Sequence, residues 1–421
     1  MSSADRASRP DPFLAAVCAL GIAQITAWGT TYYCLGVLAG PISRDTGWSQ
    51  GLIYFGFTVS LLMMGVVSTA AGRAIDRFGA RAVMSAGAVL STVALLLLSR
   101  VEGEAAYLAV WAFLGIGMRL SLYDAAFAAL VQVVPSRGRQ ALSYLTLFGA
   151  FASTVFWILG HQLNEALGWR ETLAWFAVIH LLVCLPLNWF GLSRQESEPE
   201  PVPEGVVARE VARTEAPLQG QDRRIAMAIF ALVMSLNGFV FGAVTVQLVP
   251  LLEAAGLATA AAVWVGSMKG FAQFGGRLVE IVFGRRLHAM TVARVAVGVL
   301  PWSFVVLVLA AGHLQALLLF TLVMGASQGV ITIVRGAVPL ALFGVQGYAT
   351  VLGLLATPVL IVTAASPTLV ALIVDTWGWR VAQFALLGAA ATSWLAIEGM
   401  ARWYERRRHQ PGPVHAEHRP E

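Results

Sequence analysis

Four ionisable residues lie deep inside long apolar stretches of the chain, where a charge has a high energetic cost. They are Arg119, Asp124, Lys269 and Arg335. A carboxylate in such a place can take up and release a proton, and a basic side chain can bind an anion or pair with a carboxylate. For Asp124 the sequence leaves two interpretations open, a role in coupling or substrate binding and a structural ion pair.

Spacing predicts how two of these residues are arranged. Arg119 and Asp124 are five residues apart, which is about 140° around a continuous helix. We therefore do not expect both to face a solute path at once: Asp124 lies on a stripe of small and polar residues that suits such a path, and Arg119, also a candidate pathway residue, can be held by neighbouring helices. Further polar and aromatic residues at helical spacing are candidate contacts along this path or packing residues: Gln24, Trp28, Thr31, Tyr33, Asn237 and Gln328.

The elements that carry these residues are predicted to be membrane-spanning helices. Of the 421 residues, 58% are apolar and only 12% are charged, about half the charge of a soluble domain. This excludes a soluble enzyme, a nucleic-acid binder and a disordered scaffold. Twelve apolar runs are long enough to cross a bilayer as helices. They cover residues 13–40, 51–71, 82–99, 105–130, 141–163, 172–191, 225–252, 261–283, 295–311, 315–342, 351–373 and 381–401.

A polar segment divides these runs into two sets of six. We expect an N-terminal tail (1–12), a first six-helix bundle (13–191), a linker disordered in its first half (192–224), a second bundle (225–402) and a C-terminal tail (403–421). The first helix is not expected to be a cleavable signal peptide, so we expect it to remain in the mature protein. Arginines outside the runs fall almost entirely on the side of both termini and the linker, which predicts that this side is cytoplasmic.

Short matches in the same order relate the two sets. Gly168-Trp169-Arg170 recurs as Gly378-Trp379-Arg380, an offset of about 210 residues. Gly72-Arg73-Ala74-Ile75-Asp76 has a degraded copy in Gly276-Arg277-Leu278-Val279-Glu280. Together the matches indicate parallel duplication. Asp124 and Arg335 are separated by nearly the same offset, so we expect them at similar depth in related helices.

The connection after the second helix carries a distinctive motif. Two glycines allow a tight reversal, and Asp76 can accept hydrogen bonds from an opposing helix end or pair with a facing arginine. We expect such a contact to form when one side of the molecule closes and to break when that side opens. The predicted gating residues are Gly72, Arg73, Asp76, Arg77, Gly79 and Arg81, with Gly276, Arg277 and Glu280 in the copy.

In a chain of twelve helices this motif resembles the signature loop of the major facilitator superfamily. The resemblance implies an all-α integral membrane fold of two six-helix bundles around a central cavity, lined by helices one, four, seven and ten. It also implies alternating access without a cofactor or metal. The helix-five signature of the drug/proton antiporters is absent from Phe148–Ser153. No phosphate-binding loop of an ATPase occurs, so the expected energy source is an ion gradient, in the first place protons.

Three functional hypotheses follow. Residues 28–33 and 122–127 resemble bacterial permeases of arsenic resistance and toxic-solute export, which favours proton-coupled efflux across the inner membrane, with trivalent arsenicals as one candidate solute. Cys18, Cys34 and Cys184 are not expected to form a thiolate trio. The alternatives are uptake or exchange of a small organic anion such as a monocarboxylate, and a non-transporting receptor. We expect a monomer that is not an enzyme. Its expected partners are a small solute, protons and lipid, without nucleic acid.

Overall fold

The computed structural model describes residues 11–193, 217–310 and 312–408, and these residues form helices without a strand. The first half contains α2 (Pro12–Ala27), the π-helix η1 (Trp28–Tyr32), α3 (Leu35–Thr46), α4 (Gln50–Phe78), α5 (Ala80–Ser99), α6 (Glu104–Ser121), α7 (Tyr123–Val133), the short η2 (Pro135–Arg137), α8 (Gly138–Gly149), α9 (Ala152–Leu167) and α10 (Trp169–Gly191). The second half contains α12 (Gly220–Ala254), α13 (Thr259–Phe283), the short η3 (Gly284–Arg286), α14 (Ala289–Leu309), α15 (Leu314–Phe343) and α16 (Tyr348–Arg408).

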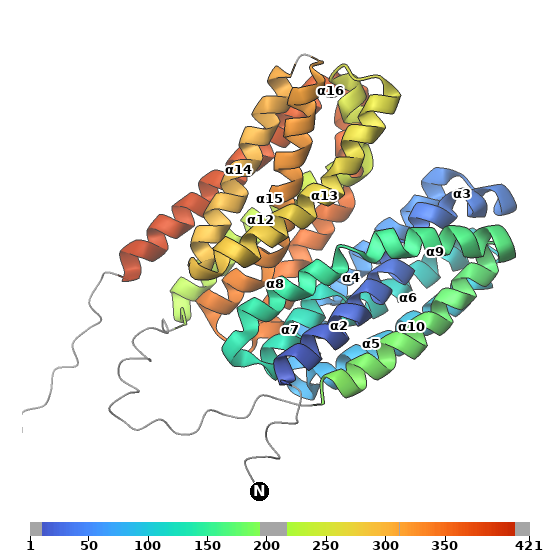
Figure 1. The fold of residues 1–421 in the computed structure, drawn as a ribbon, viewed down its shortest axis with the longest axis horizontal. Helices are drawn as coiled ribbons and strands as arrows, with labels where there is room; N and C mark the ends of the chain where they lie inside the picture. Colours follow the sequence, from blue (N-terminus) through green and yellow to red (C-terminus); the bar gives the residue numbers. More distant parts are fainter. Residues whose placement is uncertain (1–10, 194–216, 311, 409–421) are drawn as a thin grey trace, which may run out of the picture.

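The two halves form two helical lobes that meet at one end (Figure 1). We call this end, where Ser193 and Leu218 flank the undescribed part of the linker, the linker end. The lobes are joined mainly by α4 packing along α16 and by α8 packing against α13 and α15. Away from the linker end the lobes diverge (Figure 1).

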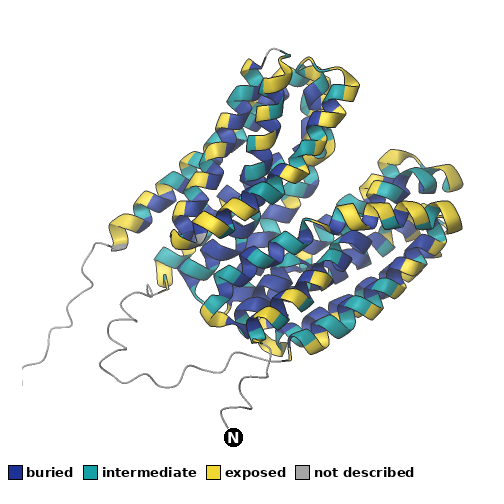
Figure 2. Cartoon of the chain, viewed as in Figure 1, coloured by how far each residue is buried: buried dark blue, intermediate teal, exposed yellow. Residues whose placement is uncertain are grey.

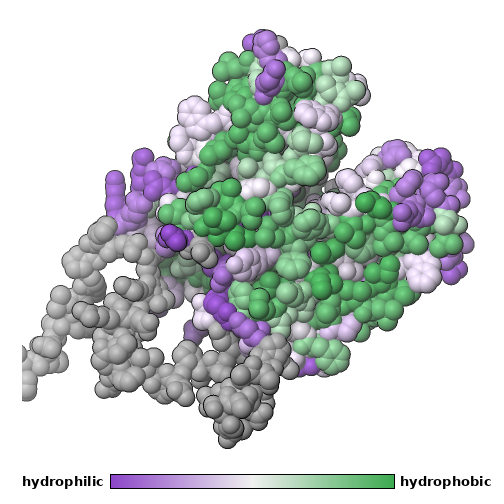
Figure 3. Space-filling model, in the orientation of Figure 1, coloured by the Kyte–Doolittle hydropathy of each residue, from purple (hydrophilic) through white to green (hydrophobic). Residues whose placement is uncertain are grey.

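The outer surface of both lobes is apolar. Buried residues fill the inside of each lobe (Figure 2), and large hydrophobic side chains such as Val66, Phe271 and Leu309 are 70% or more exposed. In the space-filling view, hydrophobic atoms cover most of the visible surface and polar atoms gather at the ends (Figure 3). Such a surface is stable in a lipid bilayer, where helices satisfy their own backbone groups.

Ten helical segments among the described residues are long and apolar enough to cross a membrane. The 61-residue α16 is interrupted at Gly378 and so contains two helices. The 25-residue α13, which carries Lys269, Arg277 and Glu280, is not among the ten. The membrane fold is therefore confirmed, whereas the number of twelve crossings stays a prediction.

The recurring glycine–tryptophan–arginine sequence has the same backbone shape in both halves. Gly168 has φ 83° and ψ 168°, and Gly378 has φ 82° and ψ 169°. Each glycine lies directly before the helix that begins with the tryptophan. Only glycine adopts this conformation readily. The sequence match thus corresponds to a repeated structural element, as duplication predicts.

Several helix limits differ from the predicted ones. The run at 13–40 is divided into α2, η1 and α3, and the run at 105–130 is broken at Leu122. The helix predicted at 51–71 continues to Phe78, α12 begins at Gly220 within the predicted linker, and α16 continues to Arg408. The predicted disorder in the first half of the linker falls on residues outside the described part of the chain.

Candidate functional site

The break between α6 and α7 positions the buried charges. Leu122 has an extended backbone (φ −83°, ψ −168°), and the side-chain amide of Gln24 donates to Ser121 O at 2.7 Å, which supplies a partner for a carbonyl at this helix end. Across the break, Arg119 Nη1 lies 3.3 Å from Asp124 Oδ2. The expectation that these two residues face different ways was wrong, because it assumed a continuous helix.

Asp124 also joins the two halves of the molecule. Its Oδ2 lies 2.5 Å from Arg335 Nη2, so one carboxylate oxygen contacts an arginine from each half. Asp124 and Arg119 are only 6% and 2% exposed, and the Arg119 Nε–H donates to Ser68 Oγ at 2.7 Å. Asp124 Oδ1 is buried without a hydrogen-bond partner among the described residues. The cluster therefore carries a net positive charge and an unused carboxylate oxygen.

The π-helix η1 gathers aromatic side chains beside this cluster. Such wide turns inside membrane and soluble helices are frequently found at functional sites. The ring of Trp28 lies 4.8 Å from that of Tyr32, 6.0 Å from that of Tyr33 and 4.9 Å from that of Tyr123. Thr30 Oγ1 and His180 Nδ1, 2.8 Å apart, tie this π-helix to α10. The predicted Trp28 and Tyr33 thus lie in one aromatic cluster with Tyr32 and Tyr123.

Three predicted path residues have side chains engaged within the protein. Gln24 binds Ser121 O and accepts from Trp28 Nε1 at 3.1 Å, and the Thr31 hydroxyl donates to Ala27 O at 2.6 Å. The Asn237 amide donates to Ser393 Oγ at 2.6 Å. The Gln24 and Asn237 contacts join different helices, whereas the Thr31 contact lies within one helical run.

The second half presents mainly cationic and amide groups. Lys269 Nζ donates to Thr245 Oγ1 at 3.3 Å and lies 5.3 Å from the centre of the Phe241 ring. Arg277 Nη1 donates to Thr146 O of the first half at 2.8 Å. The side-chain amide of Gln328 is buried, and neither its nitrogen nor its oxygen has a partner among the described residues.

The predicted gating motif contacts the opposite half. Gly72 lies so close to α16 that a Cβ there would be 2.3 Å from Ala349 O. Asp76 Oδ2 accepts from Thr350 N at 2.8 Å and from Thr350 Oγ1 at 2.5 Å, and Oδ1 accepts from Ala349 N at 3.3 Å. A carboxylate is favoured here because the first turn of α16 has free N–H groups.

Most of this motif is helical, which corrects the prediction of a loop. Gly72 to Arg77 form the last turns of α4, and Gly79 alone (φ 82°) separates α4 from α5. Arg73 and Arg77 are exposed and form no ion pair within the part of the chain that the structure describes, and Arg77 lies over the Phe78 ring.

The degraded copy makes the corresponding contact in the other direction. Glu280 accepts from Ser143 Oγ at 2.8 Å and from Arg139 Nη2 at 3.2 Å, both on α8 of the first half. Arg139 also donates to Gly284 O at 2.8 Å. Gly276 instead packs within its own half, where a Cβ would lie 2.3 Å from Ala326 O. Two acidic residues, Asp76 and Glu280, therefore each bridge the halves.

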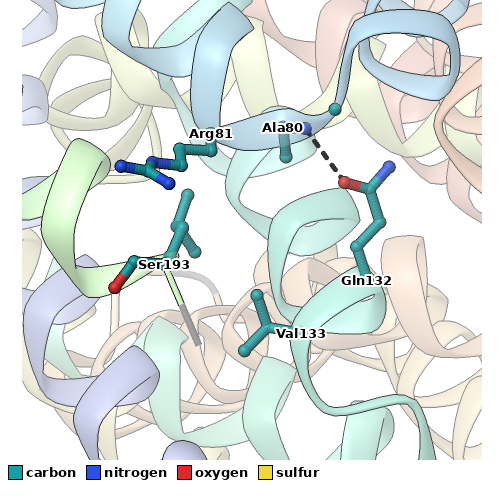
Figure 4. Close-up of a pocket in the computed structure, with 7 residues that line it drawn as sticks. Ala80, Arg81, Gln132, Val133 and Ser193 are labelled. Atoms are coloured by element: carbon teal, nitrogen blue, oxygen red, sulfur yellow. Dashed lines mark hydrogen bonds between the residues drawn. The ribbon is translucent and has the colours of Figure 1, made fainter. Parts of the chain in front are cut away.

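A pocket of about 280 Å³ lies beside the Gly79 turn (Figure 4). Arg81 lines it together with Gln132, whose Oε1 accepts from Ala80 N at 2.9 Å, and with Ser193. The Arg81 guanidinium lies 4.2 Å from the centre of the Trp189 ring. The pocket contains none of the predicted path residues.

Sequence reasoning missed the partners of both acidic bridges, Thr350 for Asp76 and Ser143 with Arg139 for Glu280. A signal was present in the repeat, because Thr350 and Ser143 are separated by nearly the offset that relates the two halves. Gln132 and His180, which fix a turn and the π-helix, had no comparable signal.

Two lobes of apolar helices with a repeated internal motif and a charge cluster between them define a helical membrane transporter built by duplication. The family model described as Major Facilitator Superfamily matches residues 20–304. The chain belongs to the major facilitator superfamily.

Curated relatives are similar over part of the chain. Multidrug resistance protein MdtL of Klebsiella pneumoniae (strain 342) is 29% identical over 156 residues, 37% of this chain and 39% of that protein. The protein of the same name from Citrobacter koseri is 26% identical over 170 residues, 40% of this chain and 43% of that protein. The chain thus spans less than half the length of these relatives.

Solved structures with the same fold cover nearly the whole chain. The human organic anion transporter MFSD10 (TETRAN) has a TM-score of 0.72 at 16% identity, covering 92% of this chain and all of that one. The proton:xylose symporter XylE has a TM-score of 0.68 at 12% identity, covering 92% and 95%. At these identities the likeness shows the fold.

Proposed function

We propose that this transporter couples the movement of a small solute to protons, with Asp124 as the proton-binding group. The observation that carries the proposal is the sharing of Asp124 Oδ2 between Arg119 of the first half and Arg335 of the second. A buried carboxylate keeps its charge while a cation is near, and otherwise tends to take a proton. Movement of the halves would change that cation contact and so link protonation to conformation.

The bridges at the linker end define the other part of the proposed cycle. Asp76 and Glu280 hold the halves together there, and the lobes diverge at the opposite end (Figure 1). If the linker end is cytoplasmic, as the arginine distribution predicts, this is an outward-facing state of a bacterial inner-membrane protein. A proton arriving at Asp124 would weaken its contact with Arg335 and favour release of the halves.

Efflux is the first candidate direction. It is supported by the names of the partly matching relatives, multidrug resistance proteins. Among the described residues no three histidine, cysteine or acidic side chains form a metal-binding group, and Cys34 and Cys184 are buried with sulfurs directed at backbone carbonyls. An arsenical solute would therefore have to bind without a set of thiolates. Its candidacy is supported by the sequence resemblance alone.

Transport of a small organic anion is the second candidate. It is favoured by the excess of positive charge in the predicted apolar runs: Arg119, Lys269, Arg277 and Arg335 stand against Asp124, Glu280 and Glu398. Glu280 and Glu398 are already paired with Arg139 and Arg294, which lie outside these runs. A cationic solute would meet unfavourable charge along this path.

Proteoliposomes with an imposed pH gradient test proton coupling, with arsenite, benzoate and a cationic dye as separate solutes. We expect Asp124→Asn to abolish gradient-driven accumulation of whichever solute the wild type accumulates, while exchange without a gradient persists. Arg335→Gln should weaken both processes.

The double variant separates coupling from structure. A purely structural ion pair predicts that each single variant is unstable and that Asp124→Asn combined with Arg335→Gln restores gradient-driven accumulation. Either that restoration or wild-type accumulation by Asp124→Asn would remove Asp124 from the coupling mechanism.

A further inference from the structure

Gln328 is an unpartnered amide in the middle of a membrane protein. Its side chain is 5% exposed, and both Oε1 and Nε2 lack hydrogen-bond partners among the described residues. Buried polar groups are nearly always bonded, and lipid offers no alternative partner. On α15, Gln328 shares a helix face with Arg335, two turns further on, which reaches across to Asp124. This face is therefore directed at the first half.

Arg277 is the second incompletely satisfied group. Its side chain is 7% exposed, one N–H donates to Thr146 O, and its Nε has no partner. No carboxylate pairs with it among the described residues. Buried arginines are rarely left without an anion, because the desolvation of the charge is then uncompensated.

Close contacts between α13 and α15 bring these two groups together. A Cβ at Gly276, next to Arg277, would lie 2.3 Å from Ala326 O, and a Cβ at Gly329, next to Gln328, would lie 2.2 Å from Gln273 O. Glycine permits such an approach because it has no side chain. Arg277 and Gln328 thus both extend from one helix crossing.

The aromatic cluster of the first half faces the same place. The hydroxyl of Tyr123 and Arg277 Nη1 both donate to Thr146 O, at 3.5 and 2.8 Å. Tyr123 contacts Trp28, whose ring also lies 4.8 Å from that of Tyr32. Cationic and amide donors on one half therefore meet flat apolar rings on the other.

We propose that the solute is an organic anion with an aromatic or similarly flat apolar group, whose anionic end binds Arg277, Gln328 and Arg335 and whose ring packs on Trp28 and Tyr123. Arginine and amide N–H groups match the geometry of a carboxylate, and aromatic rings favour offset or edge contacts with another ring. The inference rests on the proposed transport function and names its solute class.

Binding to the purified full chain in nanodiscs tests this proposal without a gradient. The probes are benzoate, benzyl alcohol and benzylammonium, measured by titration calorimetry. We expect benzoate to bind at least tenfold more tightly than the other two, since a hydrogen bond to a charged group contributes about one to two powers of ten. Equal or tighter binding of benzylammonium, or no binding of benzoate, would overturn the proposal.

Variants locate the site. Arg277→Gln should weaken benzoate binding about tenfold or more, Arg277→Lys less, and the matched control Arg100→Gln, which removes an exposed arginine at the end of α5, should leave it unchanged. Gln328→Leu separates ligand binding from structure: it should weaken benzoate binding while leaving the melting temperature equal or higher, because an orphaned amide is removed. Unchanged binding in Gln328→Leu and Arg277→Gln, or a lowered melting temperature with proportionate loss of binding, contradicts the site.

Failure of this inference and failure of proton coupling give different results. Asp124→Asn should still bind benzoate. Benzoate binding without gradient-driven transport of any tested solute overturns the coupling proposal alone, whereas gradient-driven transport of a cationic dye without benzoate binding overturns the anion site alone.

Discussion

Side chains that stabilise the break between α6 and α7 determine where the charges meet. Gln24 uses both ends of its amide, donating to Ser121 O and accepting from Trp28 Nε1. It thereby connects the helix break, which brings Arg119 to Asp124, with the aromatic cluster on η1. A single polar residue of the first helix links the charge cluster and the aromatic cluster.

We expect Gln24→Ala to lower the free energy of unfolding by about 1–3 kcal/mol, because it leaves a buried carbonyl and a tryptophan N–H without partners. Thermal unfolding in detergent measures the loss, and Gln50→Ala, an exposed glutamine at the start of α4, is the control. A wild-type melting temperature for Gln24→Ala would show that the break does not depend on this contact.

At the same scale, the sequence identified the buried charges better than their partners. Arg119, Asp124, Lys269 and Arg335 follow from their residue types alone, because charges are rare in apolar helices. That Arg119 contacts Asp124 could not be predicted, since Leu122 carries no helix-breaking signal and the break is stabilised by Gln24 from a distant helix. Thr31 and Asn237 were candidate contacts because polarity alone cannot distinguish a group bonded within the protein from a free one.

At the scale of the elements, the capping contact at the start of α2 has an effect that can be measured. Asp11 precedes α2 and lies outside the membrane-spanning segment; its Oδ1 accepts from Phe13 N at 3.0 Å, and it pairs with Arg137 at 2.7 Å. The hydrogen bond from Arg137, followed by that from Phe13, lowers the pKa of Asp11 below its usual 3.8. The folded state therefore favours the ionised carboxylate.

Because the folded-state pKa is lowered, the stabilisation from Asp11 is fully present above the unfolded value near 3.8 and is lost as the pH falls through the lower folded value. We expect Asp11→Asn to be less stable than the wild type at neutral pH and equally stable in strong acid. Melting temperatures of both proteins across this pH range test the sign. A constant difference at all pH values would contradict it.

The helices themselves were largely predictable, because a run of apolar residues of sufficient length has few alternatives in a bilayer. Their interruptions were not. Thr30 in the π-helix at Trp28–Tyr32 contacts His180 of α10, and Asp76 in the last turns of α4, beyond the apolar run, caps α16. Both features are accompanied by contacts between segments distant in sequence, which a local pattern does not reveal.

For the molecule as a whole, Asp76 and Glu280 form two bridges at one end. Each holds an acidic residue of one half against polar donors of the other. Loss of the helix-capping contact of Asp76 is worth about 0.5–2 kcal/mol, and Glu280 loses charge-assisted hydrogen bonds to side chains, so breaking both should shift the balance between conformations severalfold or more.

Spin labels at Leu167 and Trp377, exposed residues on opposite halves near Gly168 and Gly378, report this balance in a background without native cysteines. We expect Asp76→Asn with Glu280→Gln to increase the population with a short distance between these labels, since release at the linker end lets the far ends approach. Each single change should give a smaller shift. A control double variant, Glu102→Gln with Glu104→Gln, should leave the distances unchanged. The same distance distribution in the bridge variant would mean that the two contacts do not control opening.

The shared oxygen of Asp124 has a thermodynamic consequence. An anion that binds Arg335 competes with Asp124 for that guanidinium, while Arg119 from α6 also contacts the carboxylate. In the proposed mechanism, displacement from Arg335 favours a proton on Asp124, so anion and proton would promote each other's binding, and by reciprocity the two effects would be equal. A cation would instead compete with the proton. If Asp124 is the proton-binding group, as proposed above, one oxygen bound to two arginines thus sets the sign of the linkage: an inward proton gradient would drive an anion into the cell and a cation out of it.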